Sequence, residues 1–189
     1  FAEAGIAALA FDYRGFGESE GPRGRLIARR QVEDIRNSVT FLGTVPEVEP
    51  RRLNHGKVLP EAIRAMSGLE KVVDESTLEP FLRELVKIRA SQLNGCAYCL
   101  DMHFKDAVAM GEDPERLNMV AVWREAPCFT PRERAALAWT ESLTLISQTG
   151  APPADYEWMA SLFDETEQVA LSLAIIAING WNRFAIGFR

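Results

Sequence analysis

The 189-residue sequence has little histidine, little cysteine and no excess of basic residues. Its two histidines are His55 and His103, so any chemistry that needs an imidazole depends on one of them. Lys and Arg total 21 against 27 Asp and Glu, which gives a net charge of −6. An acidic chain is a poor ligand for polyanions, so we expect neither nucleic acid nor a membrane surface as a partner.

Long hydrophobic runs are also lacking. The longest run, residues 169–178, is interrupted only by Ser172. It has about half of the roughly 20 residues that a membrane span needs, and it predicts a buried core helix. Apolar residues make up 47% of the chain, as in soluble globular proteins. No targeting segment is visible, and we expect a cytoplasmic location.

The three cysteines are Cys96, Cys99 and Cys128. Their small, odd number argues against a framework of disulfides. Cys96 and Cys99 form a C-x-x-C pair, which in a cytoplasmic protein indicates redox or metal chemistry. Cys128 follows Pro127 in a predicted loop, and we expect it to be a single packed thiol.

The pattern of the sequence changes near residue 53. Residues 5–11 predict a short buried strand, residues 12–24 a glycine-rich loop and residues 27–42 a helix. From residue 53 onward only helices are predicted, so we expect a mainly α protein with two parts, residues 1–52 and 53–189. About seven helices are expected, at residues 60–73, 77–93, 96–110, 114–123, 130–147, 153–163 and 164–186.

A G-x-S-x-G motif surrounds Ser19. The nucleophile elbow of serine hydrolases needs a strand that ends at the serine and a helix that follows at once, but here Pro22 follows and the strand ends about eight residues too early. Residues 1–52 resemble the middle of an α/β-hydrolase of the dienelactone-hydrolase-like kind, through the D-x-R-G-x-G-x-S stretch at residues 12–19. The resemblance ends before that family's nucleophile, which implies a non-catalytic fragment.

Residues 95–103 (GCAYCLDMH) form a C-x-x-C-x-x-x-H motif. If a helix starts directly after Gly95, Cys96 lies in its first turn, where free N–H groups and the helix dipole stabilise a thiolate. Cys99 lies one turn further and is close enough to form a disulfide with Cys96. His103 is on the same face as Cys99 and can accept a thiol proton. The motif therefore supplies a nucleophile, a resolving thiol and a base.

Two other interpretations of the motif stay open. The cysteines could be small buried residues without a reaction. They could also bind zinc together with His103 and Cys128, although zinc ligands usually come from two separate knuckles. We expect no metal.

Residues 53–189 resemble the carboxymuconolactone decarboxylase superfamily, in its alkylhydroperoxidase D-like branch. The matching stretches are LRELVKIRASQLNGCAYCLDMHFKDAVAMGE, VWREAPCFTPRERAALAWTESLTLIS and LSLAIIAINGWNRFAIGFR. The resemblance implies an all-helical bundle, a homo-oligomer (dimer, trimer or hexamer) and reduction of a small-molecule peroxide by the cysteine pair. It implies no bound cofactor, because an external thiol such as a dihydrolipoyl group, free or on a carrier protein, reduces the pair again.

The resemblance also implies a role for each residue of the motif. Cys99 corresponds to the peroxidatic cysteine, Cys96 to the thiol that exchanges with the external dithiol, and His103 to the proton-relay histidine. The family's relay glutamate, twelve residues before the first cysteine, corresponds to Glu84, on a flank of its helix from which it can reach the next helix. Tyr98 stands where the family has a second relay histidine, so one member of the relay is replaced.

The leading hypothesis is a thiol-dependent peroxidase. The alternatives are a non-enzymatic redox sensor or scaffold whose disulfide changes its assembly, and a carboxymuconolactone decarboxylase-like lyase that needs neither thiol. Arg89 lies near the middle of the apolar face of its helix. Because an unpaired buried guanidinium is costly, we expect Arg89 to meet a carboxylate or a subunit interface.

Overall fold

The computed structural model describes residues 52–188. They belong to a compact unit of their own, Arg52–Arg189. The strand, loop and helix predicted within residues 1–52, and with them Ser19, lie outside the described residues. Within residues 52–188 there is no β-strand, which confirms the prediction of a mainly α protein. The helices of this part are α2 (His55–Val58), α3 (Pro60–Asp74), α4 (Pro80–Asn94), α5 (Ala97–Ala109), α6 (Pro114–Asn118), the 3-10 helix η2 (Met119–Val122), α7 (Pro131–Thr144), α8 (Ile146–Thr149), α9 (Pro153–Ala160) and α10 (Glu165–Gly187).

Local sequence signals explain where most of these helices begin. Proline occupies the first helical position of α3, α4, α6, α7 and α9, where its missing N–H costs no hydrogen bond. Thr130 and Glu133 form a capping box at the start of α7, and Asp164 and Glu167 form another at the start of α10. Both boxes were predicted from the sequence, and both are confirmed.

Several helices differ from the prediction. Helix α4 begins at Pro80 instead of residue 77, and α9 ends at Ala160 instead of residue 163. The short helix α2 was not predicted. Residues 114–123 form α6 and the tighter η2 instead of one helix. Residues 130–147 divide at Leu145, whose φ of −102° and ψ of 30° end α7. The Thr149 hydroxyl donates a 2.7 Å hydrogen bond to the Ser142 carbonyl and so satisfies an acceptor at the end of α7.

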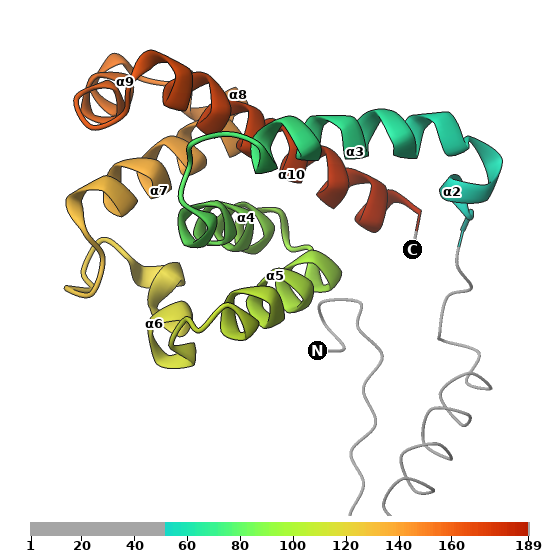
Figure 1. Ribbon diagram of the computed structural model, residues 1–189, viewed down its shortest axis with the longest axis horizontal. Coiled ribbons are helices and arrows are strands. Elements are labelled where there is room, and N and C mark those ends of the chain that lie inside the picture. The colour runs from blue at the N-terminus through green and yellow to red at the C-terminus, as the bar shows by residue number, and fades with distance from the viewer. Residues whose placement is uncertain (1–51, 189) are drawn as a thin grey trace, which may run out of the picture. The chain divides into compact units, whose positions relative to one another are not determined.

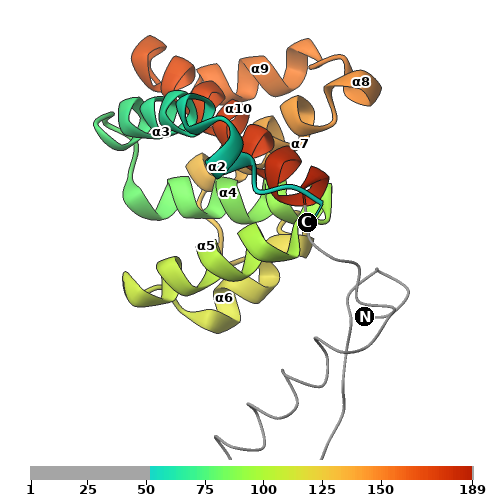
Figure 2. The ribbon, with the colours of Figure 1, turned by 90° about the vertical axis from the view of Figure 1, so that its right-hand side faces the viewer.

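Helix α4 lies at the centre of this unit. Figures 1 and 2 show α3 and α10 on one side of α4 and α5 on the other, and α7 also packs against it. Three clusters of buried apolar side chains surround α4, and the third contains the two cysteines of the motif. A residue of α4 can therefore contact the site from the interior of the bundle.

Helix α10 is the one helix of the described part that is long and apolar enough to cross a membrane. Here it packs against α3, α4 and α7. Of the run at residues 169–178, Val169 and Ile176 are exposed, whereas most of the other apolar side chains are buried. The prediction of a core helix is confirmed for this run.

Arg89 meets a carboxylate, as expected. Its guanidinium lies 2.7 and 2.8 Å from Oε1 of Glu141 on α7, and Trp123 donates to the same oxygen. The pair joins α4 to α7.

Candidate active site

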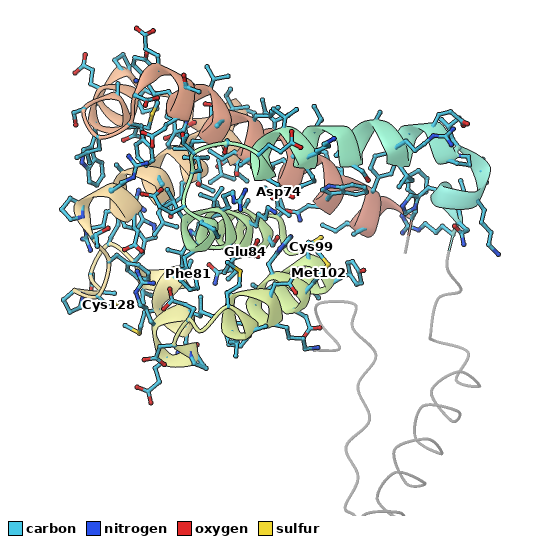
Figure 3. The ribbon with its side chains drawn as sticks, viewed as in Figure 1. Asp74, Phe81, Glu84, Cys99, Met102 and Cys128 are labelled. Atoms are coloured by element: carbon cyan, nitrogen blue, oxygen red, sulfur yellow. The ribbon has the colours of Figure 1, made fainter. Side chains whose placement is uncertain are left out.

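The cysteine pair lies at the turn between α4 and α5 (Figure 3). Gly95 ends α4 in the left-handed conformation, with a φ of 68°, and Cys96 is the N-cap of α5 with extended backbone. Cys99 follows in the first turn of α5. Both thiols are free, their sulfurs are 3.0 Å apart, and each residue is only 2% exposed. The predicted proximity of the two thiols is confirmed.

The expected place of Cys96 in the first helical turn is wrong by one residue. Because Gly95 is left-handed and Cys96 is extended, the first helical residue is Ala97. Cys96 is therefore the N-cap residue, without a capping hydrogen bond from its side chain, and Cys99 is the third helical residue of α5.

Burial raises the pKa of Cys99 to about 12, and the hydrogen bond with Cys96 adds to this effect. Hydrogen bonds from Asn182 and from the backbone lower the pKa of Cys99 but do not outweigh its burial. At neutral pH Cys99 of the reduced pair is thus a thiol. A reaction that uses its thiolate requires a base.

His103 and Glu84 form a buried pair between α5 and α4. Nδ1 of His103 lies 2.9 Å from Oε2 of Glu84. Burial alone would raise the pKa of Glu84, but the hydrogen bond and charge of His103, with a contribution from Lys87, lower it. Because a carboxylate only accepts, Nδ1 carries the proton and Nε2 is free to accept another. Figure 3 labels Glu84 and Cys99, which come from adjacent helices.

The predicted site residues therefore lie on or next to two adjacent helices and form two separate pairs, Cys96 with Cys99 and Glu84 with His103. Glu84 reaches α5 from the flank of α4, as predicted. Within residues 52–188 no hydrogen bond joins His103 to either sulfur. A proton can pass between the imidazole and a thiol through a bridging water.

Lys87 is a member of the site that the sequence analysis missed. Its Nζ lies 3.6 Å from Oε1 of Glu84 and 3.1 Å from Oε2 of Glu70 on α3. Lys87 is three residues after Glu84, so the two side chains share a helix face. That spacing was the available signal, but it did not reveal that the lysine is buried.

A network of amides surrounds the cysteine pair on the side of α10. Asn182 is fully buried; its Oδ1 accepts a 2.8 Å hydrogen bond from Asn94, and its Nδ2 donates to Ser91 at 3.1 Å. Since Oδ1 is already engaged, the N–H groups of this amide are available to Ser91 and Cys99. The sequence signal was a pair of asparagines, Asn179 and Asn182, directly after the apolar run of α10.

Tyr98 does not take the place of the second relay histidine. Its side chain is 70% exposed and lies outside the buried group of Glu84 and His103. The buried group of Glu84 and His103 therefore contains one imidazole.

The zinc set considered from the sequence is not assembled. Cys128 is exposed, and Figure 3 shows it far from Cys99. Within the described part, ligand atoms of Glu84, His103 and Asp106 lie within 4.8 Å of one another. The ammonium of Lys87 already neutralises Glu84, and the Nδ1 proton of His103 occupies the space between the two ligands. These residues fit an ion-paired relay better than a cation site.

Comparison with known proteins places the chain in a family. The model of the carboxymuconolactone decarboxylase family matches residues 60–142. The uncharacterized protein YdfG of Bacillus subtilis is 40% identical over 136 residues, which cover 72% of this chain and 92% of that protein. The chain belongs to the carboxymuconolactone decarboxylase family.

Two solved structures have a similar fold. The putative antioxidant defence protein AhpD (ATU0492) of Agrobacterium tumefaciens is 44% identical and superposes with a TM-score of 0.72 over 74% of this chain and 96% of that chain. The debrominase Bmp8 is 21% identical, with a TM-score of 0.65 over 84% of this chain and 83% of that chain, and shows the fold alone.

Membership of the carboxymuconolactone decarboxylase family indicates a peroxidase-related or decarboxylase-like function. The α/β-hydrolase resemblance of residues 1–52 stays a prediction.

Proposed function

We propose that the chain is a thiol-dependent peroxidase of the alkylhydroperoxidase D type. The observation that carries this proposal is the pair of free thiols, 3.0 Å apart, next to the buried pair of His103 and Glu84. The name of the Agrobacterium relative, a putative antioxidant defence protein, supports the same activity. An external dithiol, such as a dihydrolipoyl group, free or on a carrier protein, is the proposed reductant.

The first step of the proposed cycle oxidises Cys99. Nε2 of His103 accepts the thiol proton through a water, and Glu84 stabilises the imidazolium. The thiolate attacks the terminal oxygen of the peroxide, and the O–O bond breaks. The departing oxygen takes the proton from His103 and leaves as an alcohol, or as water when hydrogen peroxide is the substrate. Cys99 becomes a sulfenic acid.

The second step closes the cycle. The sulfur of Cys96 attacks the sulfenic acid of Cys99, and one water leaves as the disulfide forms. The external dithiol then attacks this disulfide and is itself oxidised, so both thiols of the chain are restored. The choice of Cys99 as the attacking thiol follows the family resemblance.

The proposal is tested by peroxide consumption with dihydrolipoamide. Cys99→Ser should abolish turnover, because a hydroxyl group cannot replace the thiolate. Cys96→Ser should react once with peroxide and leave Cys99 as a sulfenic acid, detectable by dimedone labelling and mass spectrometry. The matched control is Cys128→Ser, because Cys128 is an exposed thiol outside the pair, and it should retain full turnover.

The same variants separate the other hypotheses. If Cys96→Ser and Cys99→Ser both keep full turnover, the peroxidase proposal is wrong. A carboxymuconolactone decarboxylase-like lyase would keep its activity without either thiol. A redox sensor or scaffold would form the disulfide but would not consume peroxide continuously when dihydrolipoamide is supplied.

We also propose a homo-oligomer in the cytoplasm. Large apolar side chains on α3 and α10, among them Val72, Val169 and Ile176, are exposed in a single chain, and an assembly would cover such side chains. Size-exclusion chromatography with light scattering measures the number of subunits.

A further inference from the structure

Lys87 is a buried charge that the proposed cycle does not use. The residue is 7% exposed, and its Nζ is held between Glu70 and Glu84. Buried ion pairs add little stability compared with well-packed apolar residues, because desolvation offsets the attraction between the charges. Stability alone therefore gives no reason for an ammonium at this position.

The charged side chains form a line across three helices. Glu70 of α3 contacts Lys87 of α4, Lys87 contacts Glu84 of α4, and Glu84 contacts His103 of α5. The two oxygens of Glu84 are divided between its partners, with Oε1 toward Lys87 and Oε2 toward His103. The carboxylate of Glu84 is thus held from both sides, with a different oxygen toward each partner.

The other charged groups near Glu84 are few. From α5, a ligand atom of Asp106 lies within 4.8 Å of those of Glu84 and His103. From α3, Glu70 acts through Lys87. In the described part of the chain, the ion pairs that α7 makes with the α4 segment involve Arg89 and Glu79. Glu167 of α10 pairs with Arg132 of α7, so none of these ion pairs involves Lys87 or Glu84.

We infer that Lys87 is a positioning residue for the proton relay, itself held by Glu70; this inference rests on the proposed peroxidase function. The ammonium keeps Glu84 ionised and fixed in orientation. A proton that His103 takes from Cys99 then stays on the imidazole instead of passing to Glu84. It remains available to the oxygen that leaves when the O–O bond breaks.

The two neighbours of the relay have opposite electrostatic effects. Loss of the positive charge of Lys87 leaves the negative charge of Glu84 unbalanced, which favours the protonated imidazole. The base then becomes available only at higher pH. Loss of the negative charge of Glu70 has the opposite effect. The positive charge of Lys87 is then no longer balanced by Glu70, so the protonated imidazole is disfavoured and the base is available at lower pH.

The test measures the rate at which iodoacetamide alkylates the Cys96–Cys99 pair between pH 5 and 9, in a full-length Cys128→Ser protein. Lys87→Met should move the midpoint of the pH profile upward, and Glu70→Gln should move it downward, each by about 0.5–1 pH unit. The matched control, Lys71→Met, removes an exposed lysine of α3 and should leave the midpoint unchanged. Both shifts should disappear in a Glu84→Gln background, because Glu84 transmits them.

Unchanged midpoints in Lys87→Met and Glu70→Gln, or shifts that persist in the Glu84→Gln background, would overturn the inference. If Lys87→Met does not fold, Glu70→Gln alone tests the direction of the shift. Lys87→Arg keeps the positive charge and should have the wild-type midpoint. Peroxide consumption is measured separately. Shifted midpoints without peroxide turnover would refute the proposed peroxidase function but support the role of Lys87 in positioning Glu84. Turnover with unshifted midpoints would refute only the role of Lys87.

Discussion

Two buried side chains of the site, Cys99 and Glu84, have pKa values that are shifted in opposite directions. Burial raises the pKa of Cys99, and the hydrogen bonds from an amide and a backbone N–H group lower it too little to compensate. The pKa of Glu84 is lowered although it too is buried, because His103 and Lys87 both favour the carboxylate. The site therefore contains a protonated thiol and an ionised carboxylate, and in the proposed cycle the imidazole of His103 connects them.

We expect Glu84→Gln to slow alkylation of the cysteine pair near pH 7 by about 10²-fold, the low end of general-base effects. It should also destabilise the protein by about 1–3 kcal/mol at pH 7, because His103 and Lys87 lose a charged partner. Since the pKa of Glu84 is below its ordinary value of 4.5, its contribution to stability is present above pH 4.5 and is lost as the pH falls through the lowered value.

Urea unfolding at pH 3 to 7 measures this difference. The free energies of unfolding of wild type and Glu84→Gln should converge at the acidic end. Glu61→Gln, which changes an exposed side chain of α3, should stay within about 0.5 kcal/mol of wild type. An equal loss of stability at pH 3 and pH 7 would contradict the role given to Glu84.

Sequence analysis found the residues that a single helix or a family motif relates to one another. Cys96, Cys99 and His103 follow from spacing on α5, and Glu84 follows from the resemblance. Lys87 and Asn182 were missed because their roles depend on burial and on which residues of other helices lie opposite them. Spacing along one helix does not report the register between two helices.

Among the helices, the turn between α4 and α5 is the most specific element of the site. Gly95 has a φ of 68°, and a Cβ added there would meet no atom within 4 Å. Glycine is therefore required here for its left-handed backbone conformation, and not because a larger side chain would clash with neighbouring atoms. The same turn places Cys96 at the start of α5.

Gly95→Ala should destabilise the protein by about 1–2 kcal/mol, the cost of a left-handed conformation for an L-residue. Gly95→Asn should cost less, because asparagine tolerates this conformation. Gly68 of α3 is the matched control: it is helical and has open space around its Cα, so Gly68→Ala should stabilise by about 0.5–1 kcal/mol. Thermal and urea unfolding measure all three, and equal effects of both alanines would contradict this explanation.

Helix positions were predicted best where chemistry marks an end. Proline at a first position, a capping box or a left-handed glycine limits where the chain can be helical, and the starts of α7 and α10 were predicted on that basis. Leu145 carries no such signal, so the end of α7 was placed too late. The short α2 was missed because it has no proline or apolar repeat to mark it.

For the whole molecule, residues 52–188 contain the three core clusters and every residue of the candidate site. A chain that begins at residue 52 should therefore fold and consume peroxide at a rate within about 2-fold of the full chain, since core burial supplies most of the stability. Circular dichroism, size-exclusion chromatography and the dihydrolipoamide assay measure this. Aggregation or a changed subunit number would show that residues 1–51 are structurally required.

The full chain should show no esterase activity that Ser19→Ala removes.

The distance between the two free sulfurs determines how much the molecule must move during its cycle. A disulfide is about 2.05 Å long, so closing the 3.0 Å gap requires a contraction of only about 1 Å, within reach of side-chain rotation. The reduced and oxidised proteins should therefore have nearly the same outline. A redox sensor needs a surface that differs between its reduced and oxidised states, so that a partner can distinguish them. An enzyme instead benefits when it returns to its starting conformation with little rearrangement. A change this small suits the proposed peroxidase better than the redox sensor.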